Sequence, residues 1–105
     1  MIARHPGISP SAWSFIEALA VNPLVDAVIL FGSRAVGDED KRSDVDLAVC
    51  GAGISHVEWA KICLQAEEAQ TLYKFTLVHF ESNPNELRRR ILTTGVMVND
   101  RLKAA

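Results

Sequence analysis

The sequence predicts an α/β protein, of the kind also called α+β, in which helices pack on a small mixed β-sheet. Apolar residues recur first at helical and then at strand spacing, and the resulting order is helix, strand, strand, helix, strand, helix. One of these strands is nearly all apolar, which is typical of a central strand buried on both faces. At 105 residues, 49% of them hydrophobic, the chain is expected to form one domain over residues 1–105.

The first three elements follow from cap and turn residues that separate apolar runs. A helix is expected between Ser9–Pro10, an N-cap followed by a first-turn proline, and Asn22–Pro23. The run LVDAVILF at 24–31 is predicted to be the buried central strand. The run DVDLAVCG at 44–51 is predicted to be a second strand with two different faces. One face carries Val45, Leu47 and Val49, and the other carries Asp44, Asp46 and Ala48.

The second half of the chain continues the pattern. Ser55 and Glu58 form a capping box, which predicts a helix from Ser55 to about Tyr73. The run KFTLVHF at 74–80 is predicted to be a third strand, and Asn83–Pro84 opens a last helix. In that helix Leu87, Ile91 and Leu92 are expected to face inward, Gly95 to be the C-cap, and VMVN to add a short final strand.

Composition narrows the class of function. Eleven basic against 13 acidic side chains give a net charge of −2, so direct nucleic-acid binding and membrane attachment are not expected. No run approaches the ~20 apolar residues that span a bilayer, and the N-terminus lacks the apolar stretch of a signal peptide. We therefore expect a soluble cytoplasmic protein. Cys50 and Cys63 lack the spacing of a zinc site and are interpreted as reduced, buried packing residues.

Asp44 and Asp46 are the most informative polar residues, because a carboxylate on an apolar strand must be solvated, paired or bound to a metal. Side chains at positions i and i+2 of a strand share a face and lie ~6.5 to 7 Å apart at the backbone, so both carboxylates can reach one cation. Oxygen donors of this kind favour Mg²⁺ or Mn²⁺ over zinc.

Gly32 and Ser33 follow the first strand directly, at its carboxyl end, where α/β sheets place ligands. Backbone N–H groups and a hydroxyl in such a turn can hold phosphate oxygens. Two interpretations of Arg34 are open. It contacts a phosphate or the molecule that accepts a transferred group, or it pairs with an acidic neighbour at Asp38 or Glu39. A phosphate turn beside a pair of metal-binding aspartates is what a triphosphate with Mg²⁺ requires.

The segment GSRAVGDEDKRSDVDL resembles the signature of the minimal nucleotidyltransferases, relatives of polymerase β. The resemblance implies the nucleotidyltransferase fold and a Mg²⁺-dependent transfer of a nucleoside monophosphate, such as AMP, from ATP or another NTP to a hydroxyl of a protein or small molecule. It implies that Gly32, Ser33, Arg34 and Ser43 bind the nucleotide and that Asp44 and Asp46 bind the metal and are catalytic. It also implies a helical HEPN-type partner in a toxin–antitoxin module, and a homo-oligomer is a further option.

The third strand departs from that family's pattern. Its active enzymes carry a third acidic residue there, which completes the metal site and helps to deprotonate the acceptor, whereas the matching position here is Thr76. A threonine hydroxyl supplies neither charge nor a base near neutral pH. His79 is expected on the opposite face of the strand, with Glu81 on the same side as His79, so neither would replace the missing carboxylate.

Two hypotheses follow from Thr76. In the first, the protein is an enzyme that transfers NMP, with activity weakened by the missing carboxylate. In the second, it is a catalytically depleted antitoxin or regulatory module that acts by docking on a HEPN-type partner. Thr76→Asp would separate them, because it should raise turnover only in a depleted site.

Overall fold

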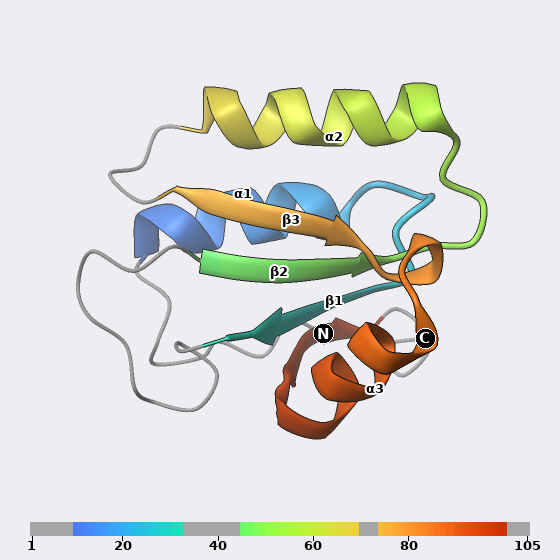
Figure 1. Ribbon diagram of the computed structural model, residues 1–105. Coiled ribbons are helices and arrows are strands. Elements are labelled where there is room, and N and C mark those ends of the chain that lie inside the picture. Colours follow the sequence, from blue (N-terminus) through green and yellow to red (C-terminus); the bar gives the residue numbers. More distant parts are fainter. Residues whose placement is uncertain (1–9, 33–44, 70–73, 101–105) are drawn as a thin grey trace.

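The computed structural model describes residues 10–32, 45–69 and 74–100 (Figure 1). Within these residues the chain forms a four-stranded mixed sheet in the order β3-β2-β1-β4. The elements are α1 (Pro10–Ala20), β1 (Ala27–Phe31), β2 (Val45–Cys50), α2 (His56–Glu68), β3 (Phe75–His79), the 3₁₀ turn η1 (Phe80–Ser82), α3 (Asn85–Thr94) and β4 (Val96–Asp100). The mixed α+β fold predicted from the sequence is therefore confirmed.

The sheet is antiparallel around β1 and parallel between β2 and β3. β1 pairs with β2 on one side and with β4 on the other, in both cases antiparallel. β2 and β3 run parallel, and α2 is the crossover between them. The starts of β2 and β3 thus lie at the same end of the sheet as the end of β1, which Figure 1 shows.

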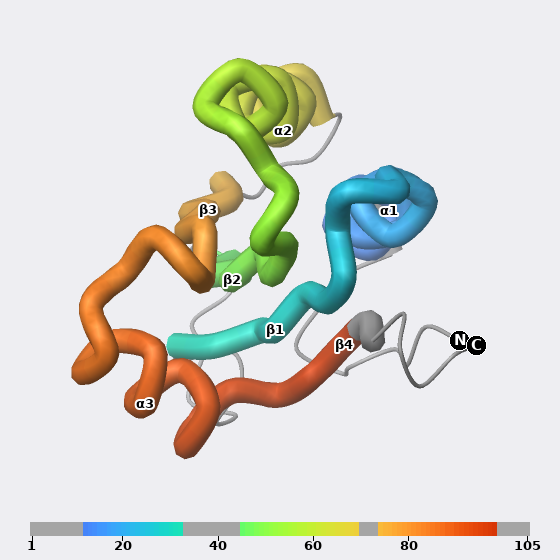
Figure 2. The backbone as a smooth tube through the Cα atoms, turned by 90° about the vertical axis from the view of Figure 1, so that its right-hand side faces the viewer, coloured from blue at the N-terminus to red at the C-terminus, as the bar shows by residue number. Residues whose placement is uncertain are grey.

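Helices cover both faces of the sheet. Figures 1 and 2 show α1 and α2 on one face and α3 on the other. The larger apolar core lies under α1 and α2 and contains Leu19, Val28, Leu47 and Ile62. The smaller one lies under α3 and is built around Ile29, Ala48 and Ile91. β1 therefore contributes side chains to both cores, as its continuous apolar run predicts.

The predicted first strand begins three residues too early. Residues 22–25 instead form a turn, in which the Asn22 side-chain oxygen accepts a hydrogen bond from Leu24 N at 2.9 Å. The Asn22 carbonyl also accepts one from Val25 N, and pairing with β2 begins where Asp26 N donates to the Cys50 carbonyl. An asparagine side chain that mimics a backbone turn delays the strand.

The predicted cap of α2 is confirmed, but its C-terminus is not. The Ser55 hydroxyl accepts a hydrogen bond from Glu58 N at 3.2 Å, the first half of the expected capping box. The helix ends at Glu68, because Ala69 adopts an extended conformation with ψ 131°. The expected continuation to Tyr73 is wrong at residue 69, and residues 70–73 lie outside the described part of the chain.

In α3, one of the three residues predicted to face inward is exposed instead. Ile91 is buried and Leu87 packs beside it, as predicted, whereas Leu92 is 61% exposed. Leu92 lies about 100° around the helix from Ile91, which takes it off the narrow stripe that meets the sheet. Gly95 is the C-cap, donating its N–H to the Ile91 carbonyl at 2.7 Å.

Cys50 and Cys63 are both free, as predicted, but only partly buried rather than fully buried packing residues. Among the described residues, no helix has the length and apolar character needed to cross a membrane.

Candidate functional site

The turn after β1 brings backbone and carboxylate together. Gly32 follows Phe31 directly and has φ 75°, a left-handed conformation that favours glycine. A Cβ built at Gly32 would overlap the Asp46 carboxylate and lie 3.2 Å from its Cγ. Phe31 and Asp46 are paired across the two antiparallel strands, which explains the closeness. Glycine is therefore required here both by φ and by the approach of Asp46.

Asp46 and Thr76 are neighbours on adjacent strands. The parallel register of β2 and β3 pairs Asp46 with Thr76, and it continues without a shift from Val45 to Val49. Paired residues of adjacent strands point to the same face, so the Asp46 carboxylate and the Thr76 hydroxyl lie on one side of the sheet. Asp46 is half-buried and Thr76 is exposed. Thr76, the position predicted to match the third acidic ligand, thus lies beside Asp46 on the neighbouring strand and carries a hydroxyl.

This group of residues lies on the α3 face of the sheet. Alternation along β2 places Asp46 on the same side as Ala48, which packs against Ile91 of α3. Asp46 stands at the start of β2, at the end of the sheet away from the start of α2 (Figure 1). Four residues predicted to bind nucleotide or metal lie outside the described residues: Ser33, Arg34, Ser43 and Asp44.

Of the two aspartates predicted to bind a metal ion, the structure describes Asp46. Within residues 10–32, 45–69 and 74–100 there is no group of three or more His, Cys, Asp or Glu side chains that could hold a metal ion. The donors that the structure does place there are the Asp46 carboxylate and the Thr76 hydroxyl. Both are oxygen donors, the type that Mg²⁺ and Mn²⁺ prefer.

His79 and Glu81 stay away from Asp46, as predicted. The His79 ring stacks on Trp59 of α2, with ring centroids 5.4 Å apart, and so lies on the opposite face from Thr76. Both Glu81 carboxylate oxygens lie 3.0 Å from Gly51 N and accept its hydrogen bond. These side chains hold the far end of β2 to the segment after β3. This pairing could not be predicted from the sequence, because Gly51 contributes only its backbone N–H.

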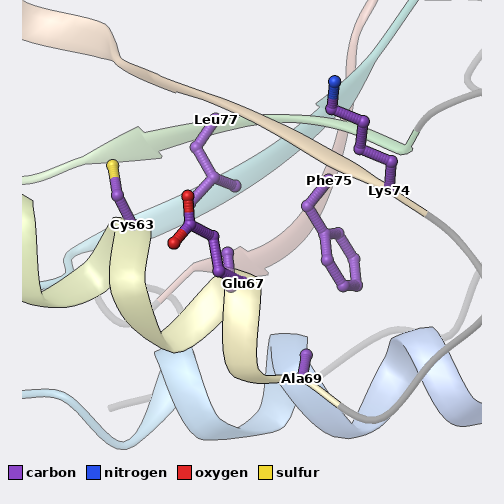
Figure 3. A pocket seen from close by; sticks show the side chains of 7 residues that line it. Cys63, Glu67, Ala69, Lys74, Phe75 and Leu77 are labelled. Atoms are coloured by element: carbon purple, nitrogen blue, oxygen red, sulfur yellow. The ribbon is translucent and has the colours of Figure 1, made fainter.

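A cavity of about 310 Å³ lies between α2 and β3 (Figure 3). It is on the α1 and α2 face of the sheet, because Phe75 and Leu77 pack against that core, whereas Asp46 lies on the α3 face. Phe75 and Leu77 form its floor, and Cys63 and Glu67 of α2 line its wall. Burial, and secondarily the nearby Glu67 carboxylate, raise the pKa of the Cys63 thiol. The cavity is separate from the Gly32–Asp46–Thr76 group, and the raised pKa of Cys63 favours its thiol over the reactive thiolate.

Comparison with known protein families shows which family this chain belongs to. Residues 14–103 match the family described as Polymerase beta, Nucleotidyltransferase. The chain belongs to this nucleotidyltransferase family. The matched span contains the Gly32 turn, Asp46 and Thr76, and the membership confirms the family predicted from the GSRAVGDEDKRSDVDL segment.

Solved structures confirm the nucleotidyltransferase fold. A toxin–antitoxin crystallised with AMP-PNP has a TM-score of 0.69 and 22% identity, covering 87% of this chain and 75% of its own. A mutant of the toxin–antitoxin MntA–HpeT, with two aspartates spaced two positions apart changed to glutamate, has a TM-score of 0.66 and 18% identity. That match covers 88% of this chain and 73% of the mutant's. No curated protein matches the chain.

Proposed function

We propose that this nucleotidyltransferase binds ATP or another NTP with Mg²⁺ and transfers NMP to a hydroxyl of a protein or small molecule. The nucleotide would bind at the turn where the Gly32 backbone meets the Asp46 carboxylate, called the Gly32–Asp46 turn below. Family membership supports the reaction type. The single observation that carries the placement is the approach of the Gly32 backbone to the Asp46 carboxylate, which leaves no room for a side chain between them. A turn of this kind presents backbone N–H groups where phosphate oxygens bind beside a metal ligand.

The metal would be held by Asp46 together with Asp44. A divalent cation bound there would neutralise charge on the triphosphate and orient it for in-line attack. The residues of this chain position the nucleotide: Gly32 and Ser33 hold phosphate oxygens, with Arg34 and Ser43 as further contacts. Gly32 allows the closest approach because it lacks a Cβ.

The transfer is proposed to be slow, because Thr76 occupies the strand position beside Asp46. A neutral hydroxyl does not attract a second cation and does not accept a proton near neutral pH. His79 does not compensate, since its ring stacks on Trp59 on the other face of the sheet. We therefore expect nucleotide binding to be easier to detect than transfer of NMP.

A second function is favoured by the similar structures. Two of them are toxin–antitoxin proteins, one crystallised with AMP-PNP and one an MntA–HpeT mutant. The alternative proposal is that this chain works as an antitoxin or regulatory module that docks on a helical HEPN-type partner. A site that binds nucleotide but lacks a base is compatible with that role.

Calorimetric titration of ATP and Mg²⁺ tests the proposal. We expect saturable binding by the wild type and its loss in Asp46→Asn. Asp26→Asn is the matched control, because it removes the same charge from an exposed position at the opposite end of the sheet. Equal binding by Asp46→Asn and wild type would refute the assignment of the site. Transfer is then followed with radiolabelled ATP and a purified acceptor protein.

A further inference from the structure

A hydroxyl and an imidazole meet at the end of the sheet that carries the start of α2. Ser82 is the last residue of η1, and His79 is the last residue of β3. Ser82 Oγ lies 2.7 Å from His79 Nδ1, and His79 Nε2 lies 2.8 Å from the Gly51 carbonyl oxygen. The imidazole is thus held between an exposed hydroxyl and a backbone acceptor.

These contacts determine which nitrogen carries the proton. A carbonyl oxygen can only accept, so His79 Nε2 must donate to Gly51 O. In the neutral ring Nδ1 is then the acceptor, and the Ser82 hydroxyl must donate to it. The ring is therefore oriented to remove the Ser82 proton, which is the arrangement of a nucleophile and its general base.

A carboxylate stands behind the base. Glu81 Oε1 lies 3.4 Å from His79 Nε2, and the same carboxylate is held in place by Gly51 N. The Glu81 carboxylate thus approaches the ring at Nε2, whereas Ser82 contacts Nδ1. Stacking on Trp59 restricts the ring further. Nucleophile, base and orienting acid are thus present together.

Ser82 and His79 line a cavity. A space of about 710 Å³ is lined by Ser82, His79 and Glu81 and, across from them, by Ser55 and Trp59. Ser55 is the N-cap of α2, so the cavity lies at the positive end of a 13-residue helix dipole. The field of the helix favours an anionic group beside Ser82, whereas the Glu81 carboxylate in the same lining opposes one.

We propose that Ser82 is a nucleophilic serine that is activated by His79. It accepts a phosphoryl or nucleotidyl group from a donor that carries a good leaving group on phosphorus, such as a nucleoside triphosphate. Ser82 Oγ attacks phosphorus, and the bond from phosphorus to the leaving group breaks. The hydroxyl proton moves to His79 Nδ1, and the leaving group, pyrophosphate for an NTP, departs with the bonding electrons. The product is a phosphodiester on Ser82 when the donor is an NTP.

This site is separate from the nucleotide site proposed above. His79 follows Thr76 by three residues along β3, a rise of ~10 Å, and its side chain leaves the opposite face of the sheet. A nucleotide bound beside Asp46 therefore does not face Ser82 of the same chain. The donor is a free NTP or a nucleotide on another molecule. The proposal holds whether or not the Gly32–Asp46 turn binds nucleotide.

A fluorophosphonate reagent tests the serine directly, because it brings its own phosphoryl group and fluoride as leaving group. The full chain is incubated with the reagent, digested and mapped by mass spectrometry. We expect labelling at Ser82 and none at Ser55, which is also exposed but caps a helix. His79→Gln should slow labelling by about 10²-fold or more, because glutamine keeps a polar side chain but supplies no base.

Glu81→Gln is a second variant in which the Gly51 contact can persist, and we expect partial slowing there. Circular dichroism shows that each variant is folded. Labelling of Ser82 no faster than of Ser55 would overturn the proposal. So would equal rates in wild type and in folded His79→Gln and Glu81→Gln.

Discussion

Thr76 pairs with Asp46 across the parallel β2–β3 ladder, and the two side chains leave the same face of the sheet. This relationship makes Thr76 the position on β3 at which a second carboxylate could join Asp46. The identity of residue 76 would therefore control how much negative charge the proposed site offers to a divalent cation.

Thr76→Asp is expected to raise NMP transfer by about 10²-fold, because it supplies both a metal-binding carboxylate and a proton acceptor. Without metal the new carboxylate repels Asp46, so Mg²⁺ should raise the melting temperature of this variant more than that of the wild type. Thr76→Asn is the control, since it matches the aspartate in shape but carries no charge. Equal rates for the Asp and Asn variants would contradict the prediction.

Gly32→Ala is expected to destabilise the fold by about 2 kcal/mol or more, and to remove nucleotide binding. Alanine is strained at φ 75°, and its Cβ would displace the Asp46 carboxylate. Gly53→Ala is the matched control, because a Cβ there meets only Leu24 Cδ2 at 3.9 Å and should change stability by about 0.5 kcal/mol at most. Denaturant unfolding measures both variants, and similar losses would show that Gly32 has no special role.

Ile91 and Leu92 provide a matched pair on α3. Ile91 is 2% exposed and packs on Ile29 and Ala48, whereas Leu92 is 61% exposed. We expect Ile91→Ala to lower the free energy of unfolding by about 2 to 5 kcal/mol through lost burial and a cavity. Leu92→Ala should change it by about 0.5 kcal/mol or less. A large loss in Leu92→Ala would mean that this leucine is covered in solution.

Alkylation of Cys63 should depend on pH in a direction set by its surroundings. Burial and then Glu67 raise the pKa of the thiol, so less thiolate is present at a given pH than in the unfolded chain. In a Cys50→Ser background, iodoacetamide should react more slowly with the folded than with the unfolded chain. The rate should also begin to rise at a higher pH in the folded chain than in the unfolded chain.

Glu67→Gln should move that rise to lower pH, because it removes the carboxylate that disfavours the thiolate. Glu68→Gln is the control, since Glu68 is exposed on the next position of α2. Equal shifts in the two glutamine variants would contradict a specific effect of Glu67.

Local signals predicted most of the fold. Ser55 and Glu58 located the start of α2 because capping depends on residues within one turn. The apolar run of β1 and the alternation in β2 identified the strands and the face that carries Asp46. Element ends were harder to predict: the start of β1 depends on the Asn22 turn, and the end of α2 on the extended backbone of Ala69.

The sequence by itself determined the family, the order of elements and the position of Thr76, since each depends on spacing along the chain. Only the tertiary structure decided that the Asp46 carboxylate closes on the Gly32 backbone, and that Leu92 stays exposed beside Ile91. It alone brought Ser82, His79, Glu81 and Gly51 together. Gly51 is separated from His79 by 28 residues, and it bonds through its backbone, which has no side chain to mark the contact in the sequence.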